Sequence, residues 1–116
     1  MATQPKQFIA GVQLGASPAA ALGGYTTDAN CTDKLYEFIF CNTHTSAVGV
    51  TINLVASGGS ATASNRILDS TNYVLNPGET RRFGLEQRLL PGAQVYGYAT
   101  VADKVSVHLS GDRVTP

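Results

Sequence analysis

The alternation of apolar and polar residues between Leu35 and Val55 constrains the fold of this chain more than any other feature. In the second half of the stretch, aliphatic residues occupy alternate positions: Val48, Val50, Ile52 and Leu54. A period of two places these side chains on one face of a β-strand and the small or polar residues on the other. Residues 42–46 are polar turn formers. The sequence therefore predicts two strands, at 35–41 and 48–55, joined as a hairpin.

The first of these two strands is apolar on both of its faces. A strict alternation would place Tyr36, Phe38 and Phe40 on one face and Leu35, Glu37, Ile39 and Cys41 on the other. Strands with two apolar faces are usually buried inside a sheet. We therefore expect this strand to be central and covered on both sides, with Glu37 at its solvent-exposed end.

Short strand candidates recur along the rest of the chain at intervals of roughly ten residues. They occupy residues 8–14, 25–27, 65–68, 72–75, 80–83, 94–100 and 104–110. Asn76-Pro77-Gly78-Glu79 predicts a type II turn, because proline presets φ at its first central position and glycine adopts the positive φ of the second. Pro91-Gly92 predicts a second turn of the same kind. Residues 101–103 are expected to close a last hairpin. Residues 85–90 fit either a strand or one helical turn.

The chain has no segment of ten residues or more with a convincing helical period, so helical crossovers for a parallel sheet are not available. The prediction is an all-β fold: a single antiparallel β-sandwich, jelly-roll-like, of about eight strands. Residues 25–116 form the sandwich domain, and residues 1–24 form an extended, partly flexible N-terminal arm. Within the arm, residues 1–6 are expected to be loose. The small residues at 15–24 fit a loop, or a helical turn at Ala19–Leu22 that Gly23-Gly24 would end.

Composition narrows the range of partners. Charged residues make up 14% of the chain, against a usual level of about 25%, and eight basic side chains balance eight acidic ones. This charge balance does not give the chain the positive electrostatic potential that non-specific nucleic-acid binding requires. The apolar runs are far shorter than a membrane span, and the N-terminal residues do not have the pattern of a secretory signal. We expect no nucleic-acid or membrane partner and a cytoplasm-like compartment until assembly.

The residue types that carry most catalytic and metal chemistry are scattered. His44 lies in a turn, and His108 lies on the polar face of the last strand. A metal site needs convergent ligands, and a hydrolytic triad needs a nucleophile held by a histidine and an acid. We expect no enzyme, no catalytic residue, no metal and no cofactor. Cys41 fits a small buried apolar residue, although a disulfide with Cys31 is possible if the two strand ends meet.

Several residues are candidates for contact with a partner protein. Arg81-Arg82 is the one basic doublet, and it fits either a salt bridge to Glu79 or Glu86 or a contact with an acidic partner. Tyrosines in the strands fit either sheet packing or interface anchors. The residues predicted to bind a partner are Phe8, Ile9, Tyr73, Arg81, Arg82 and Tyr96, with the N-terminal arm reaching toward a neighbour.

The order of motifs carries a resemblance over residues 8–114. It runs from CNT at 41–43 and VTINLV at 50–55 through LNPGET at 75–80 to LLPGAQVYGYAT at 89–100 and VSVHLSG at 105–111. This order resembles that of the small all-β virion proteins of tailed bacteriophages, of the head decoration or tail-associated type. The resemblance implies a structural role in the virion, after assembly in the host cytoplasm, and no catalytic residue.

The leading hypothesis is a head decoration (cement) protein that binds the outside of the capsid and bridges coat subunits. Its partners would be the major capsid protein or other virion proteins, and the chain is expected to form a homo-oligomer, with a trimer at local symmetry axes as the working assumption. One alternative is a tail, neck or fibre-attachment component. Another is a carbohydrate-binding module that uses Tyr96 and Tyr98 as stacking platforms.

Overall fold

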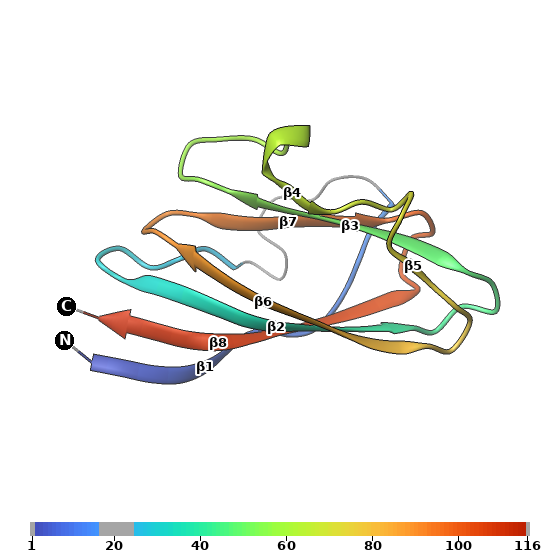
Figure 1. Cartoon of the computed structure of the whole chain (residues 1–116), viewed down its shortest axis with the longest axis horizontal. Helices are drawn as coiled ribbons and strands as arrows, with labels where there is room; N and C mark the ends of the chain where they lie inside the picture. The colour runs from blue at the N-terminus through green and yellow to red at the C-terminus, as the bar shows by residue number, and fades with distance from the viewer. Residues whose placement is uncertain (1, 17–24, 116) are drawn as a thin grey trace.

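Two antiparallel sheets pack face to face in the computed structural model, which describes residues 2–16 and 25–115 (Figure 1). The first sheet has the strand order β1-β8-β2-β6. Its strands are β1 (Ala2–Gln13), β8 (Val105–Thr115), β2 (Thr32–Asn42) and β6 (Thr80–Leu89). The second sheet is centred on β3 (Val48–Val55), which pairs with β4 (Arg66–Leu68), β5 (Val74–Leu75) and β7 (Gln94–Ala99). The predicted β-sandwich of eight strands is confirmed.

The core lies between the sheets and is built by side chains at alternate strand positions. In β8, the apolar residues Val105, Val107 and Leu109 are fully buried, while the polar residues between them lie on the outer face. The Phe38 and Phe40 rings of β2 stack with centroids 5.4 Å apart and belong to the same buried cluster as aliphatic residues of β3 and β7. Within the described residues the one helical element is a 3₁₀ turn, Ala63–Asn65.

The predicted hairpin of residues 35–55 is wrong. β2 pairs with β6 on one side and β8 on the other, so it offers no free edge to β3, which lies in the opposite sheet. Residues 43–47 instead cross between the sheets. The crossing is fixed by Asn42, whose fully buried Nδ2 donates to the carbonyl oxygens of Ser46, Leu75 and Asn76, each at 3.1 Å. The predicted last hairpin is wrong for the same reason, because β7 and β8 belong to different sheets.

The expectation that residues 1–6 are loose is wrong for residues 2–6, which form the first half of β1. Ala2 pairs with Thr115 and Lys6 with Gly111, and the strand ends of the chain lie side by side (Figure 1). Main-chain pairing holds these exposed residues, and pairing needs no apolar side chain. Register shifts further along β1 bury Ile9 and leave Ala10 exposed. The helical-turn alternative and the division at residue 24 fall on residues 17–24, outside the described residues.

Both proline-glycine turns are confirmed. The Glu79 N–H donates to the Asn76 carbonyl oxygen at 3.0 Å, and Gly78 has a φ of 74°. The Ala93 N–H donates to the Leu90 carbonyl oxygen at 3.0 Å, and Gly92 has a φ of 81°. Residues 85–89 continue β6, which selects the strand from the two alternatives for that segment.

The segments on both sides of β4 lie against the outer face of β3, a strand that is buried on both sides. Asn53 Nδ2 donates to the Thr62 carbonyl oxygen and to Asn65 Oδ1, both at 2.8 Å. Thr51 Oγ1 accepts from the Ser70 N–H at 3.0 Å. The two polar residues of β3 therefore anchor both of these segments.

Candidate functional site

A β-bulge in β2 turns Tyr36 out of the core. The pairing of β2 with both β6 and β8 shifts register between Leu35 and Glu37. Leu35 and Phe38 are both fully buried, and Tyr36 between them is 44% exposed. The prediction that Tyr36 shares a face with Phe38 and Phe40 is therefore wrong, because the extra residue reverses the alternation.

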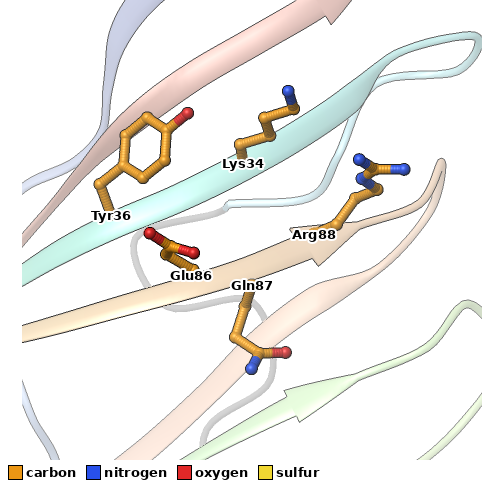
Figure 2. A pocket seen from close by; sticks show the side chains of 5 residues that line it. All are labelled: Lys34, Tyr36, Glu86, Gln87 and Arg88. Atoms are coloured by element: carbon orange, nitrogen blue, oxygen red, sulfur yellow. The ribbon is translucent and has the colours of Figure 1, made fainter.

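Tyr36 stands at the centre of a hollowed outer face of the first sheet. One hollow of about 360 Å³ is lined by Lys34, Tyr36, Glu86, Gln87 and Arg88. Figure 2 shows Lys34 and Tyr36 rising from β2 on the same side as Arg88 of β6, with Gln87 extending the other way. Adjoining hollows bring Gly84 of β6 and Lys6 of β1 beside the same ring. We call this face the Tyr36 surface, formed by Lys6, Lys34, Tyr36, Gly84, Glu86, Arg88 and Asp112.

The charges of the Tyr36 surface have mixed signs. Lys34 is the register partner of Arg88 in β6 and of Asp112 in β8, so a cation and an anion flank it on the same face. Like charges directly opposite each other in a sheet repel. Among the described residues, the ion pairs within 4.0 Å include none of the five charged side chains of this surface. Desolvation of the ring, followed by the negative charge of Asp112, raises the pKa of Tyr36.

Two glycines shape this surface in opposite ways. A Cβ on Gly111 of β8 would lie 1.9 Å from the Lys34 carbonyl oxygen, so glycine alone permits the close approach of β8 to the bulge in β2. A Cβ on Gly84 would meet nothing within 4 Å. Gly84 therefore leaves open space beside the Tyr36 ring.

A buried ion pair lies beneath this end of the sheet. Arg113 of β8 donates from Nε and Nη2 to the two oxygens of Asp33 in β2, at 2.7 and 2.8 Å. Arg113 also binds Asp28, and the Tyr25 hydroxyl donates to Asp33 Oδ2 at 2.6 Å. The Asp33 side chain is fully buried. Its burial alone would raise its pKa, but the hydrogen bonds from Arg113 and Tyr25 and the Arg113 charge outweigh that effect and lower it.

Tyr73 and Arg81, two of the predicted partner residues, are held mainly by contacts within the chain. The Tyr73 ring is half-buried against Phe40 and Phe83, with centroids 5.6 and 5.8 Å away. The Arg81 guanidinium lies 5.0 Å from the Tyr73 centroid and binds Glu79 through Nε at 2.9 Å. This contact is the intramolecular salt bridge to Glu79, one of the two alternatives that the sequence predicts for Arg81-Arg82.

The other predicted partner residues are dispersed. Arg82, with a 75% exposed side chain, lies 3.7 Å from Glu37, and Tyr96 lies half-buried with Tyr98 on the outer face of β7. Ile9 is buried in the core, and Phe8 packs on Tyr25 with centroids 5.4 Å apart. The structure brings Tyr73 and Arg81 into contact and does not join the six residues in one surface. The Tyr36 surface was not predicted from the sequence. It depends on the β-bulge in β2, which the alternation of apolar and polar residues does not reveal.

The thiols and charged groups of the described residues form no further site. Cys31 is buried and Cys41 is half-buried, and both thiols are free. Across residues 2–16 and 25–115, no three His, Cys, Asp or Glu side chains converge in a way that would hold a metal ion. Helices of the length and apolarity needed to cross a membrane are also absent from these ranges.

Comparison with solved structures relates this fold to proteins of larger assemblies. A chain from the study "Bacillus endospore appendages form a novel family of disulfide-linked pili" superposes with a TM-score of 0.55 and 18% identity, over 97% of this chain and 88% of that one. A chain of infectious bursal disease virus, Gx strain, superposes with a TM-score of 0.53 and 12% identity, over 98% of this chain but 32% of the viral one. No family model and no curated sequence matches this chain. The likeness confirms the sandwich fold, shared with a spore appendage pilin and a viral protein.

Proposed function

We propose that this chain is a structural subunit that assembles with copies of itself, and that it catalyses no reaction. The observation that carries the proposal is the pair of open edges on one sheet. β1 and β6 flank the sheet β1-β8-β2-β6, and within the described residues neither has a strand on its outer side. An open edge presents unpaired main-chain N–H and C=O groups, which suit pairing with a strand of another chain.

The proteins that share the fold support the same role. The pilin chain forms disulfide-linked pili, and the viral chain belongs to a virus particle. Copies that pair edge to edge, β1 of one with β6 of the next, make a head-to-tail contact that closes into a ring or extends as a filament. Assembly through repeated contacts of this kind requires no reactive centre.

The more specific proposal places the protein in a bacteriophage virion, assembled in the host cytoplasm. It rests on the order of motifs that resembles small virion proteins, from CNT at 41–43 to VSVHLSG at 105–111. In this role the protein is a head decoration subunit, arranged as trimers, that bridges coat subunits on the outside of the capsid. Binding to the assembled shell stabilises it by mass action.

A filament subunit is the second candidate. The observation that favours it is the superposition with the pilin chain, which covers nearly the whole of both chains. A filament needs a contact that repeats without closing, whereas a decoration trimer needs one that closes after three copies.

Electron microscopy of the purified, concentrated protein tests the structural role. Ordered rings, sheets or filaments are the expected result, and filaments would favour the second candidate. Co-sedimentation with empty phage heads, compared with isolated tails, tests the decoration role, and binding to the heads alone is expected. Dispersed single subunits in the microscope, together with no binding to either phage part, would overturn the proposal.

A further inference from the structure

The Tyr36 surface carries unpaired charges of both signs around one exposed aromatic ring. Three basic side chains, Lys6, Lys34 and Arg88, lie with two acidic ones, Glu86 and Asp112. Surface charges that serve the fold alone are commonly arranged as opposite pairs across strands. Here Lys34 faces Arg88 on one side and Asp112 on the other, and neither pair forms an ion pair within 4.0 Å among the described residues. The juxtaposition of Lys34 and Arg88 is unfavourable in the isolated subunit.

We propose that the Tyr36 surface is a contact between two copies of this chain, related by a two-fold axis that passes beside the two Tyr36 rings. In this contact Lys34 and Arg88 of each copy face the acidic side chains Glu86 and Asp112 of the other. The inference rests on the proposed assembly of copies and adds this surface as a second contact besides the edge pairing of β1 and β6.

The charges favour a second copy over other occupants. A purely acidic partner would meet the carboxylates of Glu86 and Asp112, and a purely basic one would meet three cations. A two-fold contact presents the same patch on both sides, so a patch that carries both signs can be complementary to itself. Opposite charges of the two copies then offset the repulsion between Lys34 and Arg88.

The shape of the surface fits the same occupant. Tyr36 offers a large ring with a polar tip, the combination that is enriched at the centres of protein interfaces. The open space beside it, at Gly84, leaves room for the ring of the second copy. Gly84 does not have a positive φ, so a larger residue there fills this space without straining the strand.

Sedimentation velocity of the full chain, with charge-swap variants, tests the proposal. K34E/R88E leaves Lys6 as the one basic residue of the patch, and E86K/D112K makes the patch wholly basic. Each variant alone is expected to associate at least about tenfold more weakly than the wild type, as for truncation of interface hot spots. An equimolar mixture of the two is expected to recover association, because each then supplies the charges that the other requires.

Two further variants separate contact from folding. Gly84→Trp should block the hollow and weaken association to a similar degree, with an unchanged far-ultraviolet spectrum. Tyr98→Ala, on the opposite sheet, is the matched control and should associate as the wild type does. Wild-type association by K34E/R88E and Gly84→Trp, or failure of the mixture to recover it, would overturn the Tyr36 contact and leave the proposed function standing. A wild type that never associates would overturn both.

Discussion

Arg113 and Asp33 bind each other through two hydrogen bonds inside the sandwich, at 2.7 and 2.8 Å. The pair joins the last strand to β2, and it holds the segment before β2 through Tyr25 and Asp28. The Arg113 guanidinium also lies 5.7 Å from the centroid of the Phe8 ring in β1. One buried cation thus ties three strands together beneath the Tyr36 surface.

Removing one partner of this pair should destabilise the fold strongly. In Asp33→Asn the Arg113 charge stays buried, loses its buried counter-ion and keeps only the exposed Asp28. Breaking a buried pair costs up to about 3–5 kcal/mol. Denaturant unfolding measures the loss. Asp103→Asn is the matched control, because Asp103 is exposed and asparagine tolerates its φ of 60°. Equal stability of the two variants would contradict a stabilising role for the pair.

The same pair should make stability depend on acidic pH. Because the pKa of Asp33 is lower in the folded chain than in the unfolded chain, its contribution is present above the unfolded value of about 3.9. The contribution is lost as the pH falls through the lower, folded value. Unfolding free energy measured against pH should fall less steeply in Asp33→Asn than in the wild type. Parallel curves would show that Asp33 has the same pKa in both states.

Tyr25 should introduce a second dependence at alkaline pH. Burial, followed by its hydrogen bond to Asp33, raises the pKa of Tyr25 above that of an ordinary tyrosine. The protonated hydroxyl therefore favours the folded state, and this contribution is complete below about pH 10 and lost as the pH rises beyond it. Tyr25→Phe should flatten the alkaline decline in unfolding free energy. A decline of unchanged slope would exclude Tyr25 as its source.

The close approach of β8 to the bulge in β2 should make Gly111 sensitive to the smallest substitution. Gly111→Ala places a methyl group 1.9 Å from a main-chain oxygen, and overpacking of this kind typically costs about 1–3 kcal/mol. Gly84→Ala is the matched control in β6, on the other side of β2, where the added methyl group meets open space and stability should hardly change. Thermal unfolding of both variants checks the difference, and equal midpoints would contradict the close approach.

The two thiols should differ in reactivity. Cys41 is half-buried and Cys31 is buried, so a thiol reagent applied to the native protein should label Cys41 first. Mass spectrometry after timed alkylation follows both sites, and denatured protein should show two reactive thiols. Labelling of Cys31 before Cys41 would contradict the burial of Cys31.

Local features of this fold could be predicted from the sequence, and strand partners could not. The alternation in Val48–Leu54 and the turns at Pro77-Gly78 and Pro91-Gly92 depend on neighbouring residues, and they are confirmed. Whether the turn after β2 makes a hairpin or a crossing depends on strands far along the chain. β8, which occupies one edge of β2, begins only at Val105.

The candidate surface was missed for a related reason. Relative to β8, a single extra residue at Tyr36 reverses the side-chain alternation of β2, and nothing in the local pattern of aromatic residues marks the reversal. The pairing of residues 2–6 with the other end of the chain was missed because main-chain hydrogen bonds leave no apolar signature in the sequence. In contrast, the pairing of Arg81 with Glu79 could be predicted, since the two residues follow one turn.

The mass of the full chain in solution, measured by light scattering as the protein is concentrated, tests the central claim most directly. If copies assemble, the average mass rises with concentration above the 12.1 kDa of a single chain. A mass that stays at 12.1 kDa at every concentration would contradict the account.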